Sequence, residues 1–227
     1  MSALEFLTPV ADSAEVLART PMERLSREAG ARFERREGWN VPIAFGDEAA
    51  ERERASSAVG FVDRSMLAKF ECSAPAETLA PLGLSPGVAA WRDGAWWCPV
   101  TPSRVLVVGA GGEAAALRAR VDEIGGRVVE LTTGLAALAL VGPLCRELLA
   151  RFCAVDVRPA LAPVCAFRPG SVARTPGYVL VEDEDRLLIM VGWALGEYLW
   201  RVVADAARSL GGGPLGVDVL AREAARA

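Results

Sequence analysis

Residues 105–131 carry the clearest hydrophobic pattern in the chain. Residues 105–108 (VLVV) form a continuous apolar run, which is typical of a buried strand. In the segment that follows, apolar residues recur on one helix face, at Ala116, Leu117, Val121 and Ile124. Two glycines, Gly125 and Gly126, then end the periodic pattern. The pattern predicts a buried strand followed by an amphipathic helix over residues 113–124.

Several apolar segments are separated only by short turns, and we expect each such pair to form a hairpin. The pairs are 127–131 with 135–141, 172–181 with 187–191 across the acidic turn 182–185, and the two arms of 88–100. The last pair turns over Asp93-Gly94, a dipeptide favoured in tight hairpins. Strands joined in this way pair antiparallel. The sequence therefore predicts an α+β fold of mostly antiparallel sheets with packed helices, rather than a doubly wound parallel sheet.

Other segments fit helices by their period or composition, namely 21–30, 47–57, 74–82, 143–152 and 195–210. Residues 38–42 combine glycine and proline and are interpreted as a loop. We divide the chain into a lead-in over residues 1–20, a main fold over 21–210 and a tail over 211–227. The main fold is expected to consist of two interleaved halves with their boundary near residues 100–135.

The 227 residues include no histidine. This excludes Ser-His-Asp and Cys-His nucleophiles, imidazole general bases and His-ligated metal centres. The five cysteines are Cys72, Cys98, Cys145, Cys153 and Cys165. They contain no C-x-x-C pair and are odd in number, so we expect reduced thiols and no metal site.

The formal net charge of -4 argues against a nucleic-acid partner, which would need a basic surface. The most apolar stretch, residues 187–200, is interrupted by Gly192, Gly196 and Glu197, and it is shorter than the roughly 20 residues that span a bilayer. Residues 1–9 do not have the pattern of a secretory leader. We therefore expect a cytoplasmic protein with no membrane and no nucleic-acid partner.

A glycine-rich stretch keeps a different fold open. Gly109, Gly111 and Ala114 occupy the three positions of a G-x-G-x-x-G/A dinucleotide fingerprint, and Glu130 follows about 20 residues later, where a ribose-binding acid would lie. After Glu130, however, the chain turns into another strand instead of crossing over through a helix. The glycines are therefore interpreted as a strand-to-helix loop, with a Rossmann-type NAD- or FAD-binding protein as an alternative.

Three stretches carry motifs in the order and spacing of a known family. The first contains Gly38, Trp39, Pro42, Gly60, Phe61, Asp63, Ser65 and Met66. The second is residues 128–152, VVELTTGLAALALVGPLCRELLARF, and the third is residues 153–207, with Cys153, Asp156 and the run Tyr198-Leu199-Trp200. Together they resemble the aminomethyltransferase (glycine cleavage T protein) superfamily. The third stretch is most similar to the sarcosine oxidase gamma subunits of that superfamily.

The resemblance implies two ferredoxin-like halves, as in the aminomethyltransferase folate-binding domain. It also implies tetrahydrofolate in a central hole, with an aspartate beside the pterin that assists one-carbon transfer. Where the family carries that aspartate, this chain reads GAWWCP over residues 94–99, which leaves Asp93 as the catalytic candidate and a turn residue as its alternative role. At the position of a family glutamate that binds the pterin, this chain has Leu188.

The candidate cofactor-binding residues are Met66, Trp97, Tyr178, Glu184 and Arg222. Core packing is the alternative role of Met66 and Trp97, and a solvated turn is the alternative for Glu184. Losing a pterin-binding acid should weaken folate binding severely, because the donors of the amino-pyrimidine edge are costly to bury unpaired.

We therefore expect an aminomethyltransferase-like protein that is linked to tetrahydrofolate one-carbon metabolism and whose catalysis is weak or lost. The alternative is a non-catalytic subunit, similar to a sarcosine oxidase gamma chain, in a larger flavin- and folate-dependent amine-oxidising complex. Its partner would be a larger oxidase or one-carbon enzyme subunit. The Rossmann-type protein is the second alternative.

Overall fold

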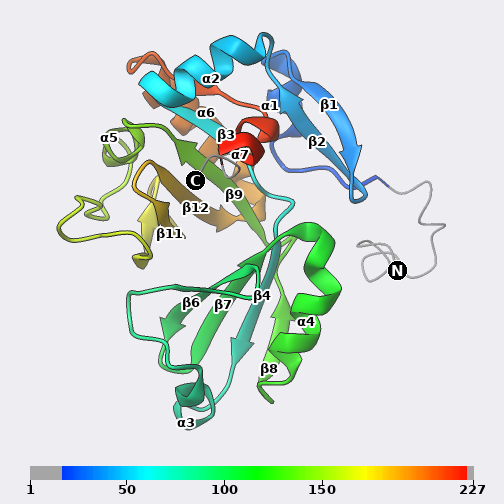
Figure 1. The fold of residues 1–227 in the computed structure, drawn as a ribbon, viewed down its shortest axis with the longest axis vertical. Coiled ribbons are helices and arrows are strands. Elements are labelled where there is room, and N and C mark those ends of the chain that lie inside the picture. Colours follow the sequence, from blue (N-terminus) through cyan, green and yellow to red (C-terminus); the bar gives the residue numbers. More distant parts are fainter. Residues whose placement is uncertain (1–16, 224–227) are drawn as a thin grey trace.

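The structure is a computed structural model that describes residues 17–223 (Figure 1). The helices are α1 (Glu23–Glu28), α2 (Glu48–Ser57), α3 (Ala76–Leu79), α4 (Ala114–Asp122), α5 (Cys145–Ala150), α6 (Gly196–Arg208) and α7 (Val217–Glu223). Among these residues, no helix has both the length and the apolar character needed to cross a membrane.

The strands form a hairpin and two larger sheets. The hairpin pairs β1 (Arg32–Arg36) with β2 (Trp39–Ala44). The six-stranded sheet has the order β10 (Phe167–Val172), β11 (Thr175–Asp183), β12 (Arg186–Gly192), β9 (Leu135–Val141), β3 (Gly60–Asp63) and β13 (Gly213–Pro214). The five-stranded sheet has the order β5 (Ala90–Arg92), β6 (Ala95–Thr101), β7 (Arg104–Gly109), β4 (Ala68–Ser73) and β8 (Arg127–Glu130).

The central strand β9 shows how the layers arise from the sequence. All seven of its residues are apolar, and successive side chains of a strand point to opposite faces. One set, Ala136, Leu138 and Leu140, packs in a core with residues of α5 and α6. The other set, Ala137, Ala139 and Val141, packs in a second core with residues of the five-stranded sheet. An uninterrupted apolar strand is therefore buried on both faces.

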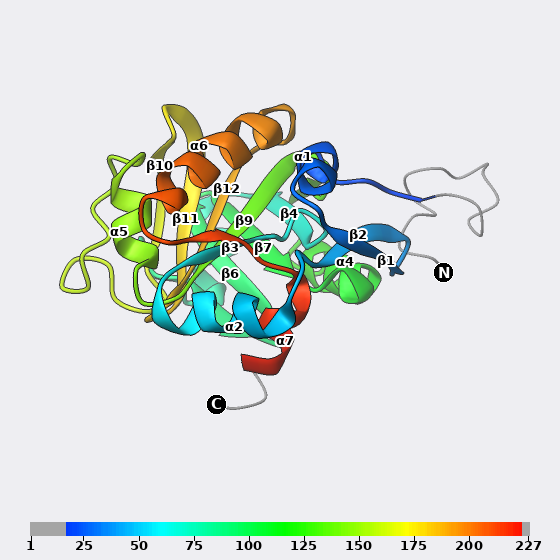
Figure 2. The ribbon, with the colours of Figure 1, turned by 90° about the horizontal axis from the view of Figure 1, so that it is seen from above.

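The side chains of the five-stranded sheet also divide between its two faces. On β6, Trp96 and Cys98 face the six-stranded sheet, whereas Ala95 and Trp97 lie in a third core with Leu117 of α4. The order of layers is thus helices, sheet, sheet, helix. In Figure 1 the five-stranded sheet and α4 form the lower part of the molecule, and Figure 2 shows α6 and α2 on opposite sides of the upper part.

Each sheet follows the ferredoxin-like order β-α-β-β-α-β. In the five-stranded sheet this run is β4, α3, β6, β7, α4 and β8, with β4 between β7 and β8. In the six-stranded sheet it is β9, α5, β11, β12 and α6, and the fourth strand position beside β9 is occupied by β3 from much earlier in the chain. The predicted α+β class with mostly antiparallel sheets is confirmed.

The dinucleotide-binding alternative is wrong, because β7 pairs antiparallel with both β4 and β6. The glycines at the end of β7 and in the turn after it allow close packing. A Cβ atom on Gly109 would lie 3.0 Å from Cδ2 of Leu117, and one on Gly111 would lie 2.9 Å from the backbone oxygen of Met66. The small residues therefore let α4 and the β3–β4 turn approach this loop closely.

Two local predictions are wrong. Residues 127–131 and 135–141 do not form a hairpin, because β8 pairs with β4 and β9 pairs with β12 and β3. The short connection between them carries the chain from one sheet to the other. Residues 38–42 are not a loop, since most of them belong to β2. Pro42 is tolerated there because β2 has a strand partner on one side only, in a two-stranded sheet. The expected hairpins over Asp93-Gly94 and over the acidic turn are confirmed.

Candidate functional site

A cavity of about 620 Å³ lies where turns of both sheets meet helix α7. Its lining includes Arg36 of β1, Arg64 after β3, Trp96 of β6, Glu182 of β11, Arg186 of β12 and Asp218 of α7. The volume is in the range of small-molecule sites, and such sites are usually apolar pockets with a few convergent polar groups. Because both halves of the fold supply its walls, the cavity depends on their assembly.

Arg64 is held at the cavity wall by the turn that follows β3. Its backbone N–H donates to the carbonyl oxygen of Ala137 on β9 at 2.9 Å. The residues on either side, Asp63 and Ser65, are buried, and the backbone N–H of Ser65 donates to Oδ1 of Asp63 at 2.9 Å. The turn thus buries alternate side chains in the protein and leaves Arg64 to line the cavity.

Lys69, the only lysine of the chain, stabilises the β3–β4 turn by hydrogen bonds to its backbone. Its side chain is fully buried, and Nζ donates to the carbonyl oxygens of Ser65 at 2.8 Å, Leu67 at 2.9 Å and Thr132 at 3.2 Å. Burial lowers the pKa of Lys69 to about 7, although the nearby Asp63 opposes this shift. Burial also raises the pKa of Asp63, which accepts a 2.5 Å hydrogen bond from the hydroxyl of Thr20.

Glu182 and Arg186 form an ion pair across the β11–β12 hairpin. Oε2 of Glu182 lies 3.3 Å from Nε of Arg186, and the Glu182 side chain is only 7% exposed. Neither atom has a hydrogen-bond partner among the described residues, so the pair is held by charge alone. Burial lowers the pKa of Arg64 in the same wall, while Glu182 raises it and Arg186 lowers it further. The acid is therefore shared between two arginines.

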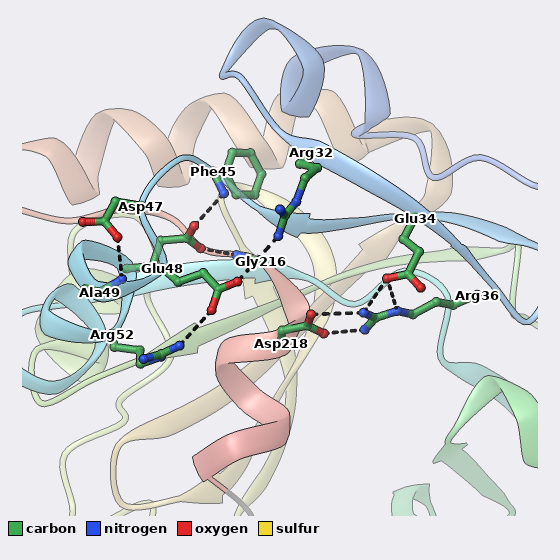
Figure 3. Close-up of polar contacts among 11 residues, drawn as sticks. Arg32, Glu34, Arg36, Phe45, Asp47, Glu48, Ala49, Arg52, Gly216 and Asp218 are labelled. Carbon is green, nitrogen blue, oxygen red and sulfur yellow. Dashed lines mark hydrogen bonds and ion pairs between the residues drawn. The ribbon is translucent and has the colours of Figure 1, made fainter.

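Helix α7 closes one side of the cavity through a second ion pair (Figure 3). Asp218 accepts two hydrogen bonds from Arg36, one of them from Nη2 at 3.0 Å. Nη2 of Arg36 also donates to Glu34 on the same strand at 2.8 Å. The β1–β2 hairpin thereby fixes the first turn of α7, and the carboxylate of Asp218 is already neutralised at the cavity mouth.

The segment before α7 is held by a buried carboxylate, Glu51 of α2. Its Oε1 accepts the backbone N–H of Phe45 at 2.6 Å, and its Oε2 accepts the backbone N–H of Gly216 at 2.7 Å (Figure 3). Gly216 also approaches β2 so closely that a Cβ atom would lie 1.9 Å from the carbonyl oxygen of Ile43. Only glycine can occupy this position, which sets the point from which α7 reaches the cavity.

Two tryptophans form the aromatic wall of the cavity. The rings of Trp91 and Trp96 meet edge to face, with centroids 5.2 Å apart and planes at 64°. Trp96 is buried, but Trp91 is 57% exposed. An exposed indole at the mouth of a cavity is an unusual use of a large apolar side chain, because it leaves much of the ring in water.

None of the predicted site residues whose side chains are described lines this cavity. Asp93 is exposed at the tip of the β5–β6 turn, and its carbonyl oxygen accepts a 2.6 Å hydrogen bond from Arg120. Met66 is half-buried in the β3–β4 turn, beside the lining residue Leu67. Trp97 points into the core under α4.

The remaining candidates also lie elsewhere. Tyr178 is half-buried and stacks on Phe167 with centroids 5.5 Å apart. Glu184 is exposed in the β11–β12 turn, whereas Glu182, two residues earlier, reaches the cavity. Arg222 belongs to α7, but its side chain lies outside the part of the chain that the structure describes. Site functions for these residues stay predictions.

The lining charges Arg64, Glu182, Arg186 and Asp218 were not among the predicted site residues. A period-2 pattern could have identified one of them. Tyr178 and Leu180 pack in the core between the sheets, and Glu182, two residues further along β11, lines the cavity although the pairing with β12 is irregular there. Nothing in the local sequence distinguishes Arg64 from a surface arginine, because its position depends on how two distant turns meet.

Comparison with known proteins agrees with this architecture. The sequence model of the sarcosine oxidase, gamma subunit family, matches residues 82–209, more than half of the chain. The chain belongs to this family. The matched span contains Trp91 and Trp96 of the cavity wall together with the Glu182–Arg186 pair.

Two solved structures show the same fold as this gamma-subunit family member. One is the glycine cleavage system aminomethyltransferase T of Bartonella henselae, with a TM-score of 0.75 and 18% identity over 89% of this chain and 60% of that one. The other is a chain of the heterotetrameric sarcosine oxidase of Corynebacterium sp. U-96 in complex with pyrrole 2-carboxylate. Its TM-score is 0.66 at 19% identity, over 85% of this chain and 96% of that one.

A short stretch of the family member is also similar in sequence to an aminomethyltransferase of Nostoc sp. (strain PCC 7120 / SAG 25.82 / UTEX 2576), with 41% identity over 59 residues. The match covers 26% of this chain and 16% of that protein. The chain therefore spans less than two thirds of the length of each of these two aminomethyltransferases. The predicted membership of the aminomethyltransferase superfamily, with a C-terminal half similar to the sarcosine oxidase gamma subunits, is confirmed.

Proposed function

We propose that this chain is a non-catalytic subunit of a larger amine-oxidising enzyme, with a role like that of a sarcosine oxidase gamma subunit. The observation that carries the proposal is that the carboxylates lining the cavity are already paired with arginines. Glu182 and Asp218 are the carboxylates among the described lining residues, and each is paired with an arginine. A carboxylate engaged in this way is a poor partner for a pterin edge or a developing iminium ion.

The strand that borders the cavity supports the same proposal. No acid occurs between Asp93 and Glu113, and the β6 residue that faces the cavity is Trp96. The aspartate that the superfamily resemblance implies for one-carbon transfer has no equivalent on this strand. Burial in the core between the sheets, with Glu182 nearby, raises the pKa of Cys98, so its thiol is not an activated nucleophile.

A surface outside the cavity lining is the candidate contact with the larger subunit. Val88, Leu161 and Val164 are 49%, 53% and 40% exposed. Their two segments are tied together by Arg168, whose guanidinium donates to the carbonyl oxygens of Gly87 at 2.5 Å and Leu161 at 2.8 Å. A fixed cluster of exposed apolar side chains is typical of a surface that a partner covers.

A tetrahydrofolate-dependent aminomethyltransferase is the competing function. It is supported by the TM-score of 0.75 to the Bartonella henselae aminomethyltransferase. At 18% identity that likeness concerns the fold, and the paired acids disfavour folate chemistry at this cavity.

Purification of the tagged chain from its native host tests the proposal. We expect it to elute with a flavin-containing partner in fixed stoichiometry, and we expect that complex to consume oxygen when sarcosine is added. A Leu161→Asp variant should lose the partner, while Val129→Asp, which changes a 40% exposed valine on β8, should retain it. A chain that elutes alone, without flavin, would contradict the subunit role.

Calorimetric titration with tetrahydrofolate distinguishes the subunit role from the aminomethyltransferase. The subunit role predicts no binding tighter than about 100 μM, which corresponds to about 5.5 kcal/mol. Tighter binding together with transfer of a one-carbon unit to tetrahydrofolate would favour the aminomethyltransferase.

A further inference from the structure

We propose that the central cavity is a binding site for a small aromatic monocarboxylate, with Arg64 as the residue that recognises the carboxylate. Arg64 lines the cavity and is half-buried, yet its guanidinium makes no hydrogen bond and no ion pair within 4 Å among residues 17–220. This half-buried guanidinium therefore presents donors to the cavity that no described residue accepts. A bidentate carboxylate matches this fork of donors.

The charge of the wall sets the charge of the ligand. Arg36, Arg64 and Arg186 face Glu182 and Asp218, so the described lining carries a net charge of +1. Asp218 is bonded to Arg36, and Glu182 is paired with Arg186 while it also attracts Arg64 at longer range. Among the described lining cations, Arg64 is the one with neither a hydrogen bond nor an ion pair within 4 Å. Glu34 also accepts a hydrogen bond from Arg36 from outside the lining, so the acceptor that a ligand has to supply is the one for Arg64. A ligand carboxylate supplies it, whereas an ammonium group has no acceptor to offer.

The rest of the wall favours a flat apolar body on this ligand. Trp91 and Trp96 present an edge-to-face pair, and Leu67 and Val108 add aliphatic surface. Trp91 is 57% exposed, so a ring placed against it would remove indole surface from water. The volume of about 620 Å³ accommodates an aromatic ring with its carboxylate.

The site differs from one built for a pterin. A pterin presents donors from its amino-pyrimidine edge and needs a carboxylate that is free to accept them. Here the deepest acid, Glu182, is 7% exposed and already paired. The unused group is a donor, Arg64, and the ligand must therefore supply the acceptor. The inference does not depend on whether the chain acts as a subunit.

Calorimetric titration of the full chain with benzoate tests the inference, with benzamide as the uncharged analogue of the same shape. We expect saturable binding of one benzoate per chain and at least tenfold weaker binding of benzamide. Arg64→Gln should weaken benzoate binding at least tenfold. The matched control is Arg158→Gln, which removes an exposed arginine paired with Asp156 outside the cavity and should leave binding unchanged.

Trp91→Ala provides a test that does not depend on the stability of the β3–β4 turn, because the Trp91 side chain is largely exposed. We expect this variant to fold and to bind benzoate at least threefold more weakly. Inorganic phosphate should compete poorly, since it lacks the ring. Absence of saturable benzoate binding, equal binding of benzamide, or equal affinity in the Arg64→Gln and Arg158→Gln variants would overturn the inference.

Discussion

Replacement of Glu51 by alanine should destabilise the protein strongly, although the residue lies on a short and mostly solvated helix. Glu51 is 2% exposed, and its two oxygens accept the backbone N–H groups of Phe45 and Gly216 at 2.6 and 2.7 Å. The substitution leaves both donors without an acceptor. Each unsatisfied buried donor costs about 1–3 kcal/mol, so we expect a loss of about 3 kcal/mol in the free energy of unfolding.

Chemical denaturation followed by tryptophan fluorescence measures this loss directly. For a chain of this size, about 3 kcal/mol corresponds to a decrease in Tm of about 6–12 °C. Glu51→Gln keeps one acceptor oxygen and should lose roughly half as much. The matched control is Glu53→Ala on the same helix, where the side chain is exposed and the change should stay within about 0.5 kcal/mol.

The comparison of these variants decides whether the reasoning holds. If Glu51→Ala and Glu53→Ala have the same stability, the two short hydrogen bonds do not hold α2 and α7 together. If Glu51→Gln is as stable as the original chain, neither the charge nor the second acceptor oxygen of Glu51 contributes to holding Phe45 and Gly216.

Three further outcomes are expected. Because burial lowers the pKa of Lys69 to about 7, the unfolded chain binds more protons above that pH, and stability should rise by about 1.5 kcal/mol between pH 7 and 8.5. Lys69→Met should remove this rise in denaturant titrations, and an unchanged slope would show that the three carbonyl hydrogen bonds keep the ammonium charged. Gly216→Ala should lower Tm by at least 6 °C, because its Cβ would overlap β2, whereas Gly192→Ala, with open space at its Cβ position, should not. Finally, a thiol reagent at pH 8 should modify half-buried Cys165 well before fully buried Cys98, and equal rates would contradict the burial.

The parts of the fold that follow from local pattern could be predicted from the sequence. The helical period of the apolar residues predicted α4, and the turn dipeptide Asp93-Gly94 predicted the β5–β6 hairpin. Pairing between distant segments could not be predicted in this way. Residues 127–141 resemble a hairpin in sequence. Nothing in the two strands indicates that β8 pairs with β4 and that β9 pairs with β12 in a different sheet.

The candidate site shows the same limit. The sequence pointed to the tryptophans of β6 and to the acidic turn, but it could not decide which neighbour faces the cavity. Trp96 and Trp97 point to opposite sides of the sheet, and Glu182 lies inside while Glu184 lies in solvent. The tryptophans differ because successive residues of a strand point to opposite faces, so an error of one residue reverses the face. The two glutamates differ because β11 ends at Asp183, which leaves Glu184 in the turn. Choosing the correct face requires knowledge of which sheet lies opposite.

The use of β3 in the six-stranded sheet has a consequence for how the chain matures during translation. The β4–β8 segment is continuous in sequence and can assemble as soon as residue 130 has emerged. In the six-stranded sheet, β3 is made long before its partner β9. That sheet is complete only when Gly213 pairs with Gly60. Contacts between such distant residues form slowly, and strands that await a partner are prone to aggregate. The nascent chain therefore leaves β3 without a strand partner until β9 has been made, and with one unpaired edge until Gly213 has been made.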